Sequence, residues 1–261
     1  MMREAGHLKS LRHANIVELQ EVLLRESRIY LVCELCHCTL GQHMEQLSIA
    51  GTVSVDPPQL QSYMTQILSA LAFCHDRRII HRDMKPDNIL MDATRRSLKI
   101  ADFGMARTII PNTAYTERCV TVWYRPPEII LGDRRYGTPV DMWSVGCILA
   151  EMITFAPVFR CDTEIECLLH MFRSLGTPDE SSWPGVSALP NFQPAFPRWP
   201  PQSPAALLNG EGADAAAADA AAGPHCLDLL GRLLQLRPES RIRAHEALDH
   251  PFFCEPAHPR P

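Results

Sequence analysis

The chain has 261 residues, 46% of them hydrophobic and 21% charged, with a formal net charge of −5 at pH 7. That length can bury a large core, and the composition is ordinary for a soluble globular protein. The charge offers no basic surface for nucleic acid, no apolar run approaches the roughly 18 residues that span a bilayer, and no secretory signal begins the chain. We therefore expect a cytoplasmic or nuclear protein that binds neither nucleic acid nor membrane.

Ten cysteines are scattered singly along the chain, several of them inside apolar runs. This distribution favours buried, reduced thiols over a disulfide framework. Cys33, Cys36 and Cys38 lie close together, but a structural zinc site usually needs a second pair of ligands at a matching spacing, and the sequence offers none. Zinc is therefore not expected at these residues.

The first part of the chain combines a short helix with strands. Residues 4–12 read as a helical stretch that ends near His13. Two short apolar runs of strand type follow at 16–19 and 22–24, and residues 29–33 read as a second strand. We expect a small sheet beside this helix.

The remainder of the chain is mainly helical. A long helix follows Asp56, because apolar residues then recur with a period of about 3.6 residues. The later elements are expected as strands at 79–80, 89–91 and 98–100, and as helices at 140–153, 164–175 and 226–236. A few strands followed by a helical mass predict an α+β fold.

Residues 211–223 form a segment of low complexity, rich in alanine. Alanine favours helix intrinsically, but this run has no large apolar side chains to bury. We expect a surface insertion there, as frayed helix or disordered chain.

Two motifs carry chemistry. Residues 81–88 read His-Arg-Asp-Met-Lys-Pro-Asp-Asn, and residues 102–104 read Asp-Phe-Gly. The first matches H-R-D-x-x-x-x-N, the catalytic loop of protein kinases, with methionine where leucine is usual, and the second matches the motif that holds Mg²⁺ in those enzymes. Both motifs occur in the expected order.

Each polar residue of these motifs has a physical role to fill. Asp83 can accept the hydrogen bond of an incoming Ser or Thr hydroxyl and orient it, and Lys85 can offset the charge of the transferring phosphoryl group. Asn88 and Asp102 carry the oxygen ligands that Mg²⁺ prefers. The pattern therefore predicts MgATP as cofactor.

The chain resembles the eukaryotic protein kinases, and within them the cyclin-dependent kinases, from about Arg3 to Phe253. The resemblance implies an α+β kinase fold: residues 1–35 as a remnant of the small lobe, residues 36–253 as the large lobe, and residues 254–261 as a tail. The segments that carry it, besides the two motifs, are Asn15-Ile16-Val17, Leu71-Ala72-Phe73-Cys74-His75, Thr121-Val122-Trp123-Tyr124-Arg125-Pro126-Pro127-Glu128, Val140-Asp141-Met142-Trp143-Ser144-Val145-Gly146-Cys147, Leu175-Gly176-Thr177-Pro178-Asp179-Glu180 and Arg241.

The resemblance also implies structural roles. Glu128 would form a buried ion pair with Arg241, and Asp141 would hydrogen-bond the backbone of the catalytic loop. Val120 and Arg125 resemble residues that shape the pocket for a proline after the target Ser or Thr.

Regulation is implied at one threonine. Thr116 occupies the position of the activating phosphothreonine of cyclin-dependent kinases. Arg3, Arg82 and Arg107 match the arginines that receive its phosphate, and such a charge cluster could order the loop. A cyclin-like subunit would be the regulatory partner.

The adenine end of the site is implied by residues 33–36. Cys33 falls at the position next to the hinge where a bulky apolar residue is more usual. Glu34 and Cys36 would lie in the hinge whose backbone binds adenine, and Leu90 would form the floor beneath the ring. Backbone contacts tolerate side-chain changes, so ATP remains the expected ligand.

One part of the kinase pattern is missing from the 261 residues. Glu4 matches the helix glutamate that pairs with a strand lysine, but no glycine-rich loop and no such strand precede it. None of the three lysines, Lys9, Lys85 and Lys99, fits that position. These residues alone should therefore bind nucleotide weakly and turn over negligibly.

Three interpretations remain open. The sequence could be a truncated version of a complete enzyme that acts on Ser-Pro or Thr-Pro sites, a genuine short pseudokinase that binds a cyclin or a substrate, or a fragment that does not fold stably. The four intact residues of the motifs favour the first interpretation.

Overall fold

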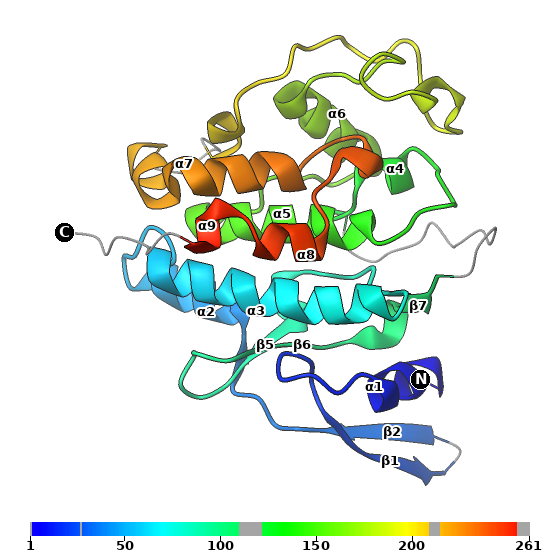
Figure 1. The fold of residues 1–261 in the computed structure, drawn as a ribbon, viewed down its shortest axis with the longest axis vertical. Helices are drawn as coiled ribbons and strands as arrows, with labels where there is room; N and C mark the ends of the chain where they lie inside the picture. Colours follow the sequence, from blue (N-terminus) through cyan, green and yellow to red (C-terminus); the bar gives the residue numbers. More distant parts are fainter. Residues whose placement is uncertain (1, 27, 110–121, 209–214, 255–261) are drawn as a thin grey trace.

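The computed structural model describes residues 2–26, 28–109, 122–208 and 215–254, with only the backbone for residues 2–3 and 215–222. Its first part holds one helix, α1 (Met2–Ser10), beside a hairpin of β1 (Leu19–Arg25) and β2 (Arg28–Cys33). This small part lies at one end of the molecule, and the helical mass fills the rest (Figure 1). The described residues thus have the α+β character that the sequence predicts.

Short strands and two helices connect the small part to the helical mass. The helices are α2 (Leu40–Ile49) and the long α3 (Pro57–Asp76). β3 (Cys38–Thr39), β5 (Ile89–Met91) and β6 (Leu98–Ile100) form one antiparallel sheet, and β4 (Ile79–Ile80) pairs with β7 (Arg107–Thr108).

Helices dominate from residue 127 onward. They are α4 (Pro127–Ile130), α5 (Pro139–Thr154), α6 (Glu164–Leu175), α7 (Ala215–Leu233), α8 (Ala244–Leu248) and α9 (Pro251–Cys254). Single turns of 3-10 helix lie at Pro86–Asn88, Phe103–Met105, Val186–Ala188, Pro204–Leu208 and Pro238–Ser240.

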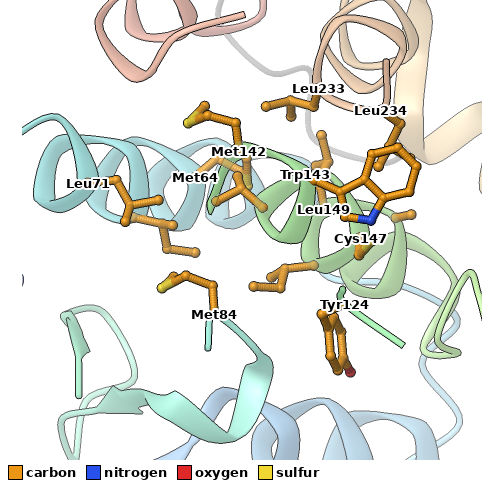
Figure 2. Close-up of a cluster of buried hydrophobic side chains, with 14 of the residues drawn as sticks. Met64, Leu71, Met84, Tyr124, Met142, Trp143, Cys147, Leu149, Leu233 and Leu234 are labelled. Atoms are coloured by element: carbon orange, nitrogen blue, oxygen red, sulfur yellow. The ribbon is translucent and has the colours of Figure 1, made fainter. Parts of the chain in front are cut away.

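The core is built around α5, which is buried along almost its whole length. Figure 2 shows Trp143 and Leu149 of α5 between Leu71 of α3 and Leu234 near the end of α7. At Gly146 the two helices approach so closely that a Cβ atom would lie 2.7 Å from Leu234 Cδ2. A larger residue there would force α5 and α7 apart.

Several features differ from the expectations. Helix α2 was not predicted, although Thr39 and Gln42 form a capping box at its start. The runs at 16–19 and 22–24 contribute one strand before β2, as predicted, but β1 begins only at Leu19, and Ile16 instead forms an isolated parallel bridge with Ile100.

The C-terminal helix begins earlier than predicted. The backbone of the alanine-rich segment from residue 215 onward is helical and belongs to α7, which kinks at Gly223 with a φ of 61°. Residues 211–214 of that segment, like the tail at 255–261, lie outside the described residues.

Two cysteines also depart from the prediction. Cys161 and Cys167 form a disulfide in the structure, so the expectation of reduced thiols is wrong for this pair. Seven other cysteines of the described residues are free. Among the described helices, none is both long and apolar enough to cross a membrane.

Candidate active site

The backbone of the loop at residues 81–88 is fixed from below by Asp141 on α5. Its two carboxylate oxygens accept hydrogen bonds from the backbone N–H of His81 at 2.9 Å and of Arg82 at 2.8 Å. His75 contacts the same carboxylate at 2.8 Å. Burial alone would raise the pKa of Asp141, but the hydrogen bonds and nearby histidines lower it below its usual value. The fully buried carboxylate therefore acts as an anchor for the loop.

Arg82 is held in an unusual backbone conformation. Its φ is 69°, in the left-handed region that non-glycine residues rarely adopt. Its side chain is 7% exposed, and it donates from Nε to Met105 O and from Nη1 to Tyr136 Oη, both at 2.7 Å. Nη2 is buried and has no partner among the described residues.

The other members of the implied phosphate cluster are only partly placed. Arg107 lies in β7, next to the strand that leads into the catalytic loop. Thr116 and Val120 lie outside the described residues, and for Arg3 only the backbone is described. The cluster thus remains a prediction.

The catalytic candidates gather around Asp83. Asn88 donates from Nδ2 to Asp83 O at 2.7 Å and to Asp83 Oδ2 at 3.0 Å. Lys85 Nζ lies 3.4 Å from the same carboxylate oxygen. The amide and the ammonium fix the orientation of this carboxylate but neutralise only part of its charge. It can therefore still accept a hydrogen bond from a hydroxyl group.

Asp102 is brought beside this group by strand pairing. Ala101 N donates to Asn88 O at 2.8 Å, so the residue that follows lies next to the loop. Asp102 is exposed, has a φ of 60° and accepts a hydrogen bond from Gly104 N at 3.2 Å.

Asn88 and Asp102 fit Mg²⁺. Since Nδ2 of Asn88 is used toward Asp83, its Oδ1 is the atom left for a cation. The Asp102 carboxylate is solvent-accessible, and Mg²⁺ usually takes only one or two protein ligands, with phosphates and water completing its shell. This donor set suits a nucleotide-bound ion.

Glu4 approaches the same region from α1. A Cβ atom on Gly104 would lie 3.8 Å from Glu4 Oε2. The pKa of Glu4 is raised, first by burial and then by the charge of Asp102. The helix therefore points its glutamate toward the Asp-Phe-Gly segment.

The hinge candidates lie between the small part and α2. Glu34, Cys33 and Cys36 are half-buried, whereas Leu35 is 98% exposed. Leu90 lies in β5 and pairs in register with Lys99 of β6. Burial, and then the charges of nearby acids, raise the pKa of both thiols. They are therefore poor nucleophiles near neutral pH.

Glu128 and Arg241 form a bidentate ion pair deep in the large part. The nitrogen–oxygen distances are 2.6 and 2.5 Å, and the side chains are 1% and 0% exposed. The arrangement is the one that the resemblance implies, and it links α4 to the chain before α8.

Two contacts were missed by the sequence analysis. Tyr124 donates a hydrogen bond to Glu151 Oε2 at 2.6 Å, and burial raises the pKa of Glu151 to about 7. Arg125 pairs with Glu164 at the start of α6. The only available signal was Glu151 itself, an acid within the apolar helix predicted at 140–153.

A comparison with protein families accounts for this arrangement. The family model described as protein kinase domain matches residues 1–253, nearly the whole chain. The match agrees with the predicted α+β kinase fold and with the loop, anchor and Asp-Phe-Gly segment described above. The chain therefore belongs to the protein kinase family.

Proposed function

We propose that this chain carries the catalytic residues of a cyclin-dependent-kinase-like Ser/Thr kinase, which transfers the γ-phosphoryl group of ATP to Ser-Pro or Thr-Pro sites in proteins. The observation that supports this most is the set of contacts around Asp83, whose carboxylate is held by Asn88 and Lys85 on a loop anchored to α5.

Each residue would act through position and charge. Asp83 accepts the hydrogen bond of the substrate hydroxyl and orients its oxygen toward the γ-phosphorus. Lys85, 3.4 Å from Asp83 Oδ2, is close enough to offset charge on the phosphoryl group in flight. Asn88 and Asp102 would hold Mg²⁺, which when bound neutralises phosphate charge.

Substrate choice and activation are inferred from the resemblance and from two side chains. Arg125 is buried and paired with Glu164, next to the segment that would contact the residue after the target. Arg82 keeps a buried Nη2 group available, as a receptor for phosphorylated Thr116 would require. A cyclin-like subunit is the proposed activator.

The alternative function is a pseudokinase that binds a cyclin or a substrate without catalysis. It would use the same fold and the same anchored loop, so an assay of phosphate transfer distinguishes the two functions.

The test is a phosphorylation assay on the protein purified from its own cells with its bound subunits. Wild type should transfer phosphate from MgATP to a Ser-Pro peptide and far less to the matched Ser-Ala peptide, and Asp83→Asn should abolish transfer. Equal transfer by wild type and Asp83→Asn would refute the role of Asp83. No transfer by either, together with retained cyclin binding, would favour the pseudokinase.

A further inference from the structure

The side chain of the hinge residue Glu34 ties together three segments that are distant in sequence. Its Oε1 accepts a hydrogen bond from Glu18 N at 2.7 Å and forms an ion pair with Lys99 Nζ at 2.9 Å. Its own backbone N–H donates to Glu18 O at 3.0 Å. One carboxylate oxygen thus joins the hinge, the segment before β1 and strand β6.

Strand β6 leads directly to the metal-ligand candidate. Lys99 lies three residues before Asp102, so the Cα atoms of the two residues are at most about 10 Å apart. The strand is also held by hydrogen bonds from Ile100 N to Asn15 O and from Val17 N to Ile100 O, both 2.9 Å. A shift of Lys99 therefore moves β6, the strand that leads to Asp102.

The tie lies next to the proposed adenine pocket. Lys99 pairs in register with Leu90, the expected floor residue. The Glu34 carboxylate also contributes, after burial, to the raised pKa of Cys36, so it lies close to that thiol. Hinge, floor and tie belong to one neighbourhood.

We propose that Glu34 is a positioning residue, which through Lys99 sets the spacing between the hinge and Asp102, and so between the adenine and phosphate ends of a bound nucleotide. This inference rests on the proposed function, because it assigns Glu34 a role in nucleotide binding. The two side chains are 23% and 22% exposed, so the pair contributes geometry more than global stability.

The sharpest perturbation is Glu34→Gln. Glutamine keeps a carbonyl oxygen for Glu18 N and nearly the same shape, but it loses the charge that holds Lys99. The matched control is Glu45→Gln, the same change at an exposed position on α2. Lys99→Gln removes the other partner, and Lys99→Arg keeps the charge.

Three measurements compare wild type with these variants, and each adds only its own probe to the protein. Amide hydrogen exchange at Ile100 should become about fivefold faster in Glu34→Gln and in Lys99→Gln. Affinity for MgADP should weaken by a similar factor, and the apparent pKa for alkylation of Cys36 should fall in Glu34→Gln. Glu45→Gln and Lys99→Arg should behave as wild type.

The outcomes separate this inference from the proposed function. Exchange at Ile100 that is unchanged in Glu34→Gln overturns the inference, whether or not nucleotide binds. So does an MgADP affinity equal to that of Glu45→Gln when wild type binds measurably. Faster exchange in a protein whose wild type binds no MgADP supports the tie from hinge to β6 and counts against nucleotide binding, and thus against the proposed function.

Discussion

Replacing Arg241 by alanine leaves the buried Glu128 carboxylate without its ion-pair partner. The described contacts of that carboxylate are the two hydrogen bonds to Arg241, and its side chain is 1% exposed. Arg241, by contrast, also donates to the carbonyl oxygens of Gln235, Pro139 and Leu236. The two partners are therefore not equivalent, and truncating each should have a different effect.

The structure sets the size of that difference. A charge-assisted hydrogen bond contributes about 1.5–3 kcal/mol, and breaking a buried pair costs about 3–5 kcal/mol. We expect a loss of about 4 kcal/mol for Arg241→Ala. Glu128→Ala should lose about 3 kcal/mol, because three carbonyl groups still surround the guanidinium. The double variant Glu128→Leu/Arg241→Met should lose less than Arg241→Ala, since it leaves no buried charge.

Urea denaturation followed by circular dichroism measures these differences. The control is Arg232→Ala, which removes an exposed pair with Asp228 on α7 and should cost less than about 0.5 kcal/mol. By melting temperature, Arg241→Ala should unfold roughly 10 °C below wild type. The reasoning fails if Arg241→Ala lowers the free energy of unfolding by less than about 1 kcal/mol, where ~3–5 kcal/mol is expected. It also fails if Glu128→Ala lowers that free energy more than Arg241→Ala does.

Two further predictions concern α5. Because burial raises the pKa of Glu151 to about 7 from 4.5, its contribution to stability is present below pH 4.5 and is lost as the pH rises through 7. Glu151→Gln keeps an acceptor for Tyr124, so its free energy of unfolding should match that of wild type near pH 5 and exceed it by up to about 3 kcal/mol near pH 8. Urea titrations at both pH values measure this difference, and equal pH profiles for the two proteins would contradict the prediction. Asp141→Ala should lower kcat about 100-fold with little change in the KM for ATP, because His81 and Arg82 lose the acceptor that fixes the loop; steady-state assays that give a kcat near wild type would show that the anchor is dispensable.

Much of the fold was accessible from the sequence because strong local patterns govern it. The helix predicted at 164–175 has these bounds in the structure, where Thr163 accepts a hydrogen bond from Glu166 N at its start. The helix predicted at 140–153 differs by one residue at each end. In both segments, apolar periodicity and buried packing agree.

What escaped prediction depends on contacts between distant segments. The run at 16–19 has strand character, but the parallel bridge to Ile100 is a tertiary event that no local pattern reveals. The same holds for the tie between Glu34 and Lys99 and for the pairing of Tyr124 with Glu151, whose partners lie 65 and 27 positions apart. The motifs identify candidate site residues from the local sequence. The pairings between distant residues become visible only in the folded chain.

The left-handed backbone at Arg82 has a consequence for how the protein moves. A non-glycine residue in that region costs about 1–2 kcal/mol, and here the Asp141 carboxylate and the contacts of the guanidinium hold it there. The loop cannot relax locally without also freeing α5, so loop and helix should open together as one cooperative unit. Local fluctuations would then leave Asp83 in place until the core itself unfolds. The site would be preorganised before a substrate binds.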